Sequence, residues 1–145
     1  RARALGLEAN VRFAGQVEDL GPLLAAADAV VLPSRWEGMP LVLLEALARG
    51  RPVAASAVGG VPEVATDGEH ARLVAPGDPA ALATALEEFH RHPDAALRMG
   101  WRGAARVRED YSWSRVVETF EAVYDEVLGL ASFAGEEPGA GRGGR

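Results

Sequence analysis

Two carboxylates, Glu37 and Glu45, lie eight positions apart in the run EGMPLVLLEALARG and are the residues of this chain best placed to do chemistry. Glu45 falls inside a helical pattern made otherwise of Leu, Val and Ala. It cannot face bulk water unless that face of the helix lines a cleft. Burying an ionised carboxylate without partners costs several kcal/mol. We therefore expect Glu45 to meet hydroxyl groups or cations, and this requirement points to a ligand.

The helix predicted to begin near Pro40 offers a site for an anion. Its first backbone N–H groups have no partner within the helix, its dipole is positive at that end, and Gly38 lets the backbone approach a ligand closely. At about 1.5 Å of rise per residue, Glu45 lies roughly 8 Å beyond Pro40, close to the separation of a diphosphate from the ribose of the same nucleotide. The spacing is compatible with a phosphate at the helix start, a ribose on Glu45 and sugar hydroxyls on Glu37.

Strands and helices alternate along the first half of the chain. We expect the end of a helix at 1–7, strands at 11–15, 29–33, 52–56 and 71–75, and helices at 20–27, 40–48 and 61–65. Three further helices follow, starting at Asp78-Pro79, at Ala95 and at Ser112 or Ser114. This order predicts an α/β fold, with a Rossmann-like parallel sheet, helices on both of its faces and a C-terminal helical extension. Ligands of such sheets bind beyond the carboxyl ends of the strands, where Glu37, the Gly59-Gly60 turn and the segment 15–19 all fall.

Composition narrows the possible functions. The 145 residues are 48% hydrophobic and carry a net charge of −6 without a basic cluster, which predicts a globular protein that does not bind nucleic acid. There is no Cys, and all fifteen basic residues are Arg, so thiolate metal sites, Lys Schiff bases and P-loop lysines are excluded. The lack of a long apolar run or a signal-peptide pattern predicts a soluble, cytoplasmic protein and leaves membrane association open.

The pattern at the two ends predicts the domain limits. The chain opens at Arg1, in what reads as the end of a helix leading into a strand, so we expect it to be part of a larger protein. A single domain is expected over residues 1–129, truncated at its N-terminus. The Gly-rich, polar residues 130–145 are expected to form a disordered tail.

The stretch from Ala27 to Gly68 resembles the donor-binding, C-terminal half of a family-4 retaining glycosyltransferase of the GT-B fold. That family has a Glu, seven residues and a second Glu, then an Ala-x-Ala-x-Gly-x-Pro-Val segment and a Gly-Gly-x-x-Glu turn. This chain has Glu37 and Glu45, the run EALARGRPV and the turn GGVPE in the same order. The resemblance extends from about Leu5 to Leu128.

The resemblance implies a role for each matching position. Glu45 would hold the ribose hydroxyls of a nucleotide-sugar, and Glu37 would meet the donor hexose near the reacting centre. Backbone groups around Gly38, Met39, Pro40 and Leu41 would approach the sugar and the distal phosphate, although Pro40, where the family often has Gly, has no N–H. The loop Gly15-Gln16-Val17 would border the nucleobase. The implied reaction is sugar transfer from the nucleotide-sugar to an unknown acceptor, with retention at the anomeric carbon and without a metal or other cofactor.

Other parts of the implied site are not in this sequence. The resemblance places a glycine-rich loop and a basic pair that clamp the diphosphate upstream of residues 11–15, and an acceptor-binding N-terminal GT-B domain before them. We therefore expect the 145 residues alone to be inactive. Two alternatives stay open: another GT-B enzyme such as a sugar-nucleotide epimerase, and a non-enzymatic nucleotide-sugar-binding module or inactive remnant.

Overall fold

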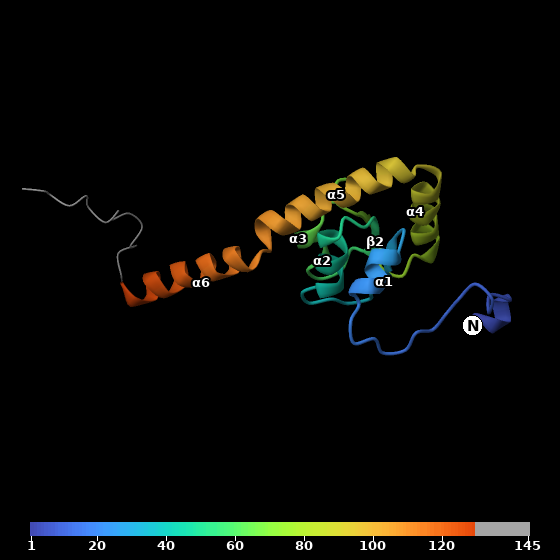
Figure 1. Ribbon diagram of the computed structural model, residues 1–145, viewed down its shortest axis with the longest axis horizontal. Helices are drawn as coiled ribbons and strands as arrows, with labels where there is room; N and C mark the ends of the chain where they lie inside the picture. Colours follow the sequence, from blue (N-terminus) through green and yellow to red (C-terminus); the bar gives the residue numbers. More distant parts are fainter. Residues whose placement is uncertain (130–145) are drawn as a thin grey trace, which may run out of the picture.

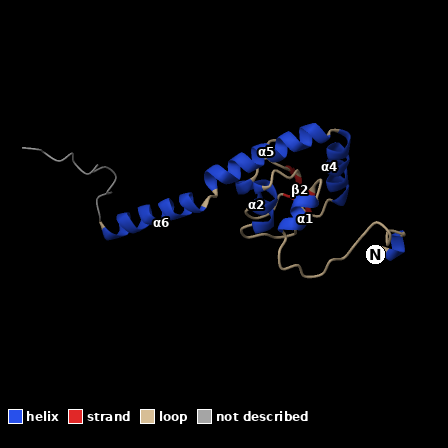
Figure 2. Cartoon of the chain, viewed as in Figure 1, coloured by secondary structure: helices blue, strands red, loops and turns tan. Residues whose placement is uncertain are grey.

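The computed structural model describes residues 1–129 and shows a three-layer α/β body from which both ends of the described chain extend (Figure 1). The sequence expectation for residues 130–145 lies outside the described residues. The elements, in order, are η1 (Arg3–Leu5), α1 (Gly21–Ala26), β1 (Val30–Leu32), α2 (Leu41–Ala48), β2 (Val53–Ser56), α3 (Val61–Val64), β3 (Arg72–Val74), α4 (Pro79–Arg91), α5 (Pro93–Asp110) and α6 (Trp113–Leu128). The described part is mainly helical around a small sheet (Figure 2).

The sheet is parallel, and its strands lie in the order β1-β2-β3. Val30 pairs with Val53 across the first ladder, and Ala54 pairs with Arg72 across the second. The central strand β2 is buried along its whole length, as expected for a strand covered by helices on both faces. The sequence prediction of a parallel sheet is confirmed.

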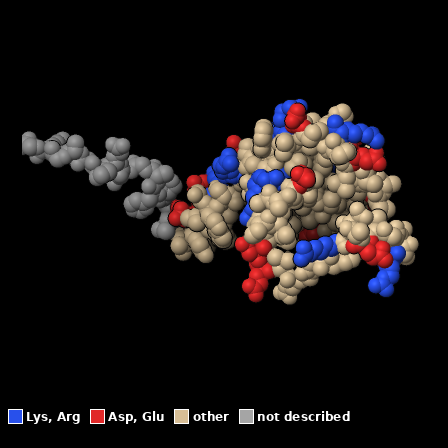
Figure 3. Space-filling model, turned by 45° about the vertical axis from the view of Figure 1, so that its right-hand side comes forward, with Lys and Arg blue, Asp and Glu red and all other residues tan. Residues whose placement is uncertain are grey.

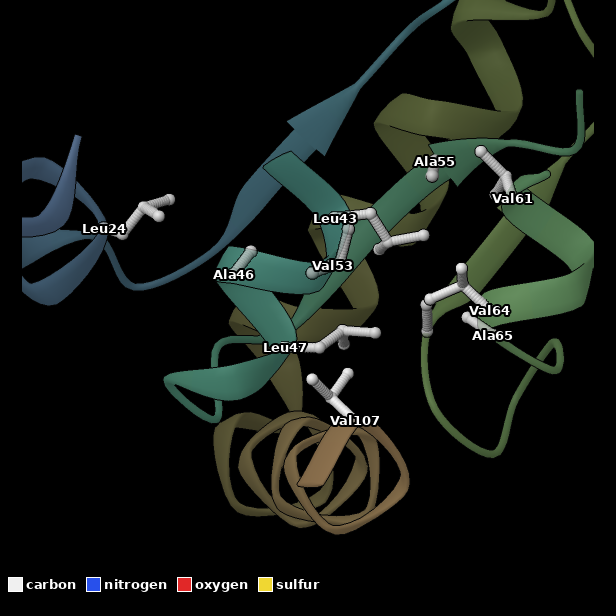
Figure 4. Close-up of a cluster of buried hydrophobic side chains, with 11 residues drawn as sticks. Leu24, Leu43, Ala46, Leu47, Val53, Ala55, Val61, Val64, Ala65 and Val107 are labelled. Atoms are coloured by element: carbon white, nitrogen blue, oxygen red, sulfur yellow. The ribbon is translucent and has the colours of Figure 1, made fainter. Parts of the chain in front are cut away.

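Alternate residues of β2 face two separate apolar layers. Val53 and Ala55 belong to the larger cluster, which also takes side chains from α1, α2, α3 and α5. Figure 4 shows Leu43 and Leu47 of α2 beside Val53, with Val107 of α5 next to Leu47. On the opposite side of β2, Ala54 packs with residues of α4 and the first half of α5. Helices therefore cover both faces of the sheet, as the sequence predicted.

Helix ends follow the local sequence signals. The Asp78 carboxylate accepts a hydrogen bond from the Ala81 backbone N–H at the start of α4. The Ser112 hydroxyl likewise accepts a hydrogen bond from the Arg115 backbone N–H at the start of α6. Of the two serines expected to cap that helix, Ser112 is therefore the one that does.

The strand predicted at 11–15 is wrong. These residues have no secondary structure and run clear of the body, with Val11 and Phe13 exposed. A strand exists only where a neighbour accepts its backbone hydrogen bonds, and no described strand lies beside this segment. The described sheet has three strands where four were expected.

The last helix is also separate from the body. α6 has an apolar stripe as predicted, but none of its residues is buried and it projects away from the sheet (Figure 1). Within the described residues, no helix is both long and apolar enough to cross a membrane.

Candidate functional site

Two loops meet at the carboxyl edge of the sheet. The Glu37 loop (residues 33–40) joins β1 to α2, and the glycine turn (residues 57–60) joins β2 to α3. The backbone N–H of Gly60 donates to the carbonyl of Gly38 at 3.1 Å. A Cβ at Gly60 would collide with that carbonyl, and a Cβ at Gly59 would collide with the carbonyl of Glu37. The glycine pair is therefore needed for the two loops to cross this closely.

Glu37 is half-buried in its loop, and its side chain is held locally. The Ser34 hydroxyl donates to Oε1 of Glu37 at 2.6 Å. Among the described residues, no other hydrogen bond or ion pair reaches this carboxylate. One oxygen is therefore fixed by the protein and the other remains available as an acceptor. The sequence analysis singled out Glu37 but gave no contact to Ser34, because an i, i+3 spacing in a loop does not by itself predict one.

The start of α2 leaves several backbone donors free. Pro40 is the N-cap residue and, as a proline, has no N–H to give. The Leu41 N–H is bonded to the Met39 carbonyl at 3.0 Å, while the Gly38, Met39 and Val42 N–H groups have no backbone partner in the described chain. Of the positions expected to approach a ligand, Gly38 and Met39 thus keep a free N–H, and Val42 is an addition that sequence reasoning missed.

Glu45 lies on the outward face of α2. Its neighbours on this face, Leu41 and Val42, are exposed, whereas Leu43 and Leu47 are fully buried against the sheet. The carboxylate is exposed as well, and so its apolar sequence neighbours do not enclose it. The sequence allowed an exposed Glu45 only where this helix face lines a cleft, and that cleft stays a prediction.

Exposed apolar side chains continue this surface onto the Glu37 loop. Trp36 is 80% exposed and Met39 is 56% exposed, so the loop presents large apolar groups beside the half-buried carboxylate of Glu37. Together with Leu41, these side chains form an exposed apolar rim along the Glu37 loop and the first turn of α2.

The predicted base-bordering loop is placed less closely. Gly15, Gln16 and Val17 are exposed, and Gly15 adopts a positive φ of 69°. Two residues later, Asp19 accepts from the Gly21 N–H at 2.8 Å. A Cβ built on Gly21 would lie 3.1 Å from a guanidinium nitrogen of Arg49, just after α2. The loop thus enters the body beside the end of α2, and in the described chain it makes no hydrogen bond to either carboxylate.

A separate cavity of about 310 Å³ opens at the same edge of the sheet, on the side covered by α4. Its lining includes Pro33 after β1, Ser56 at the end of β2 and Gly77 after β3, together with Arg35. Neither Glu37 nor Glu45 lines it.

Over the face drawn in Figure 3, acidic and basic side chains are interspersed.

Comparison with known proteins assigns the chain to a family. The model of the family described as "Glycosyl transferases group 1" matches residues 1–92. The D-inositol 3-phosphate glycosyltransferase of Streptomyces coelicolor is 42% identical over 129 residues, covering 88% of this chain and 28% of that protein. The phosphatidyl-myo-inositol mannosyltransferase of Mycobacterium leprae is 41% identical over 130 residues, covering 88% of this chain and 34% of that protein. The chain therefore spans about a third or less of these relatives.

Solved structures agree in fold. Sucrose-phosphate synthase from Thermosynechococcus elongatus superposes with a TM-score of 0.82 at 33% identity, covering 90% of this chain and 33% of the other. The Anabaena protein HepE, solved in complex with UDP-glucose, superposes with a TM-score of 0.78 at 27% identity, covering 89% of this chain and 35% of the other. With its α/β sheet matching these GT-B enzymes, the chain belongs to the group 1 glycosyltransferase family.

Proposed function

We propose that the complete protein transfers a sugar from a nucleotide-sugar donor to an acceptor with retention of anomeric configuration, and that this chain binds the donor. Family membership supports the transferase activity. The structural relative HepE was solved with UDP-glucose, which supports a nucleotide-sugar as the donor.

The observation that carries the proposal is the crossing of the Glu37 loop over the glycine turn at the start of α2. It fixes the backbone of a loop in which Glu37, with one carboxylate oxygen free, is followed directly by Gly38 and Met39, whose N–H groups have no backbone partner in the described chain. A sugar phosphate needs both kinds of group, because its hydroxyls donate hydrogen bonds and its phosphate accepts them.

The roles follow along α2. We assign the hexose hydroxyls to Glu37, the distal phosphate to the N–H groups of Gly38 and Met39, and the ribose to Glu45, with Leu41 packing beside the donor. Pro40 has no N–H to donate to the ligand. Gly15, Gln16 and Val17 would border the base after the exposed N-terminal segment moves toward α2. No metal or other cofactor is included, since the free N–H groups can meet the phosphate directly.

The acceptor and the second wall of the cleft are assigned to the part of the protein that corresponds to the N-terminal GT-B domain of its relatives. The apolar rim formed by Trp36, Met39 and Leu41 is open in the described chain, as a surface that faces another domain would be.

Donor binding and stereochemistry test this proposal. Calorimetric titration of the complete protein with UDP-, GDP- and ADP-sugars is expected to find one nucleotide series that binds, and Glu45→Gln to weaken it. Glu87→Gln is the matched control, because Glu87 is an exposed glutamate on α4 that is paired with Arg91. Proton NMR of the early product is expected to show the anomeric configuration of the donor. Failure of all three series to bind, or an inverted product, would contradict the proposal.

A further inference from the structure

The hydrogen bond between Ser34 and Glu37 joins the end of a strand to the carboxylate of the loop. Its O···O distance of 2.6 Å is in the range of a charge-assisted hydroxyl–carboxylate bond. Both side chains are half-buried, so water competes for this bond less than it would on an open surface. Neither Arg35 nor Trp36, the residues between them, is held in this way, and both are exposed.

We infer that Ser34 is a positioning residue for Glu37: its hydroxyl fixes Oε1 of the carboxylate so that Oε2 is presented to a hydroxyl of the donor sugar. The inference rests on the proposed function for the identity of the ligand. The contact itself is independent of that function.

Glu37 needs such a partner because its loop fixes only the backbone. The glycine turn packs against the carbonyls of Glu37 and Gly38, which sets where the loop lies. The glutamate side chain has three rotatable bonds, so holding it in one rotamer costs conformational entropy. In the described chain, the hydrogen bond from Ser34 restricts the Glu37 side chain to one rotamer.

Ser34 is itself well anchored. It lies two residues beyond Leu32, which pairs with Ala55 in the buried strand β2. The preceding Pro33 restricts the backbone between the strand and the hydroxyl. The chain of contacts therefore runs from the sheet through Ser34 to the carboxylate, which is how a rigid element holds a functional group in place.

The polarity of the bond limits what can bind. Because the ionised carboxylate only accepts hydrogen bonds, a ligand group that meets Oε2 must be a donor such as a sugar hydroxyl. A group that only accepts hydrogen bonds, such as a carboxylate on the sugar ring, could not form a hydrogen bond with Glu37.

Steady-state kinetics of the complete protein test the inference. Loss of one charge-assisted hydrogen bond is expected to lower kcat about tenfold in Ser34→Ala, with little change in the donor KM. Ser34→Thr keeps the hydroxyl and is expected to restore most of the activity. The matched control is Ser112→Ala, which removes a serine hydroxyl that also makes an i, i+3 hydrogen bond, at the start of α6. If Ser34→Ala behaves as Ser112→Ala does, or if Ser34→Thr fares no better than Ser34→Ala, the inference is wrong.

A double-mutant cycle separates positioning from direct contact with the substrate. If Ser34 acts through Glu37, Ser34→Ala is expected to have no further effect on the residual activity of Glu37→Ala. A full tenfold loss in that background would overturn the inference and make Ser34 a substrate-contacting residue.

A structure of the complete Ser34→Ala protein tests the contact without any assay. We expect the Glu37 carboxylate to leave its present position or to take several rotamers. An unchanged, single Glu37 rotamer would overturn the inference. Should the wild-type protein transfer no sugar, the proposed function fails while this comparison still decides the role of Ser34.

Discussion

At the scale of single residues, the two carboxylates of the site occupy different environments. Glu37 is half-buried and hydrogen-bonded, whereas Glu45 is exposed on α2 among apolar side chains. A carboxylate whose geometry is fixed by the protein suits a reacting centre, where orientation determines rate. A carboxylate on an open helix face suits a part of the donor that does not react, where binding is the same before and during the reaction.

Glu45 is accordingly expected to affect donor binding. If Glu45 accepts from the ribose hydroxyls as proposed, Glu45→Ala in the complete protein should raise the apparent donor KM about tenfold, with kcat nearly unchanged, because uniform binding is lost. Initial rates over a range of donor concentrations measure both constants. A lowered kcat with an unaltered KM would contradict the ribose assignment.

Glu37 is expected to affect the chemical step. Glu37→Ala should lower kcat about a hundredfold and leave the donor KM within about threefold of the wild type, since the proposed contact of Glu37 is with the sugar near its reacting carbon. The same rate measurements test this change, with Glu87→Ala as a control on α4. Wild-type kinetics in both the Glu37 and Glu45 variants would refute the site.

At the scale of elements, the crossing of two loops sets the position of Glu37. Gly60 has an ordinary φ of −72°, so its requirement for glycine comes from the contact with the Gly38 carbonyl alone. Gly77 provides the converse case, because its φ is 77° and the space around it is open. Gly60 therefore has to be glycine because a side chain would collide with its neighbour, whereas Gly77 has to be glycine because of its backbone conformation.

Gly60→Ala is expected to push the Glu37 loop away from the glycine turn. The collision is with backbone atoms, so the stability should fall by about 1–3 kcal/mol and activity should fall together with it. Gly77→Ala should cost about 1 kcal/mol through its backbone conformation and leave kcat unchanged. Urea unfolding and initial rates measure the two effects. Equal losses of activity in both variants would show that the crossing does not position the loop.

The same elements show what sequence could predict. β1, β2 and β3 were found from apolar runs, and the ends of α4 and α6 from Asp78 and Ser112, because these signals are local. The segment 11–15 has an equally good local pattern but lacks a neighbouring strand. Whether Glu45 is enclosed or lies on an open helix face could not be decided, because sequence spacing does not show which side of α2 faces the sheet. The Ser34–Glu37 bond depends on a loop conformation that no periodic pattern encodes.

At the scale of the whole molecule, the described chain has two apolar surfaces without a partner in the structure. One is the rim of Trp36, Met39 and Leu41 beside the carboxylates. The other is the stripe along α6, which includes Phe120 and Tyr124 at 59% and 62% exposure. Exposed side chains of this size and number are uncommon on a monomer that works alone. Their presence agrees with a chain that spans about a third or less of its relatives.

This openness leads to a prediction about the chain by itself. Retaining transfer needs the donor to be held against an acceptor with water excluded. In the proposed site, Glu37, Glu45 and the free N–H groups at the start of α2 supply only one wall, so the 145 residues alone are expected to transfer no sugar from any nucleotide-sugar. The complete protein, assayed with the same donors and acceptor mixture by mass spectrometry, is expected to form product. Donor-dependent transfer by the chain alone would show that this wall is sufficient, and the assignment of the acceptor to another domain would then be wrong.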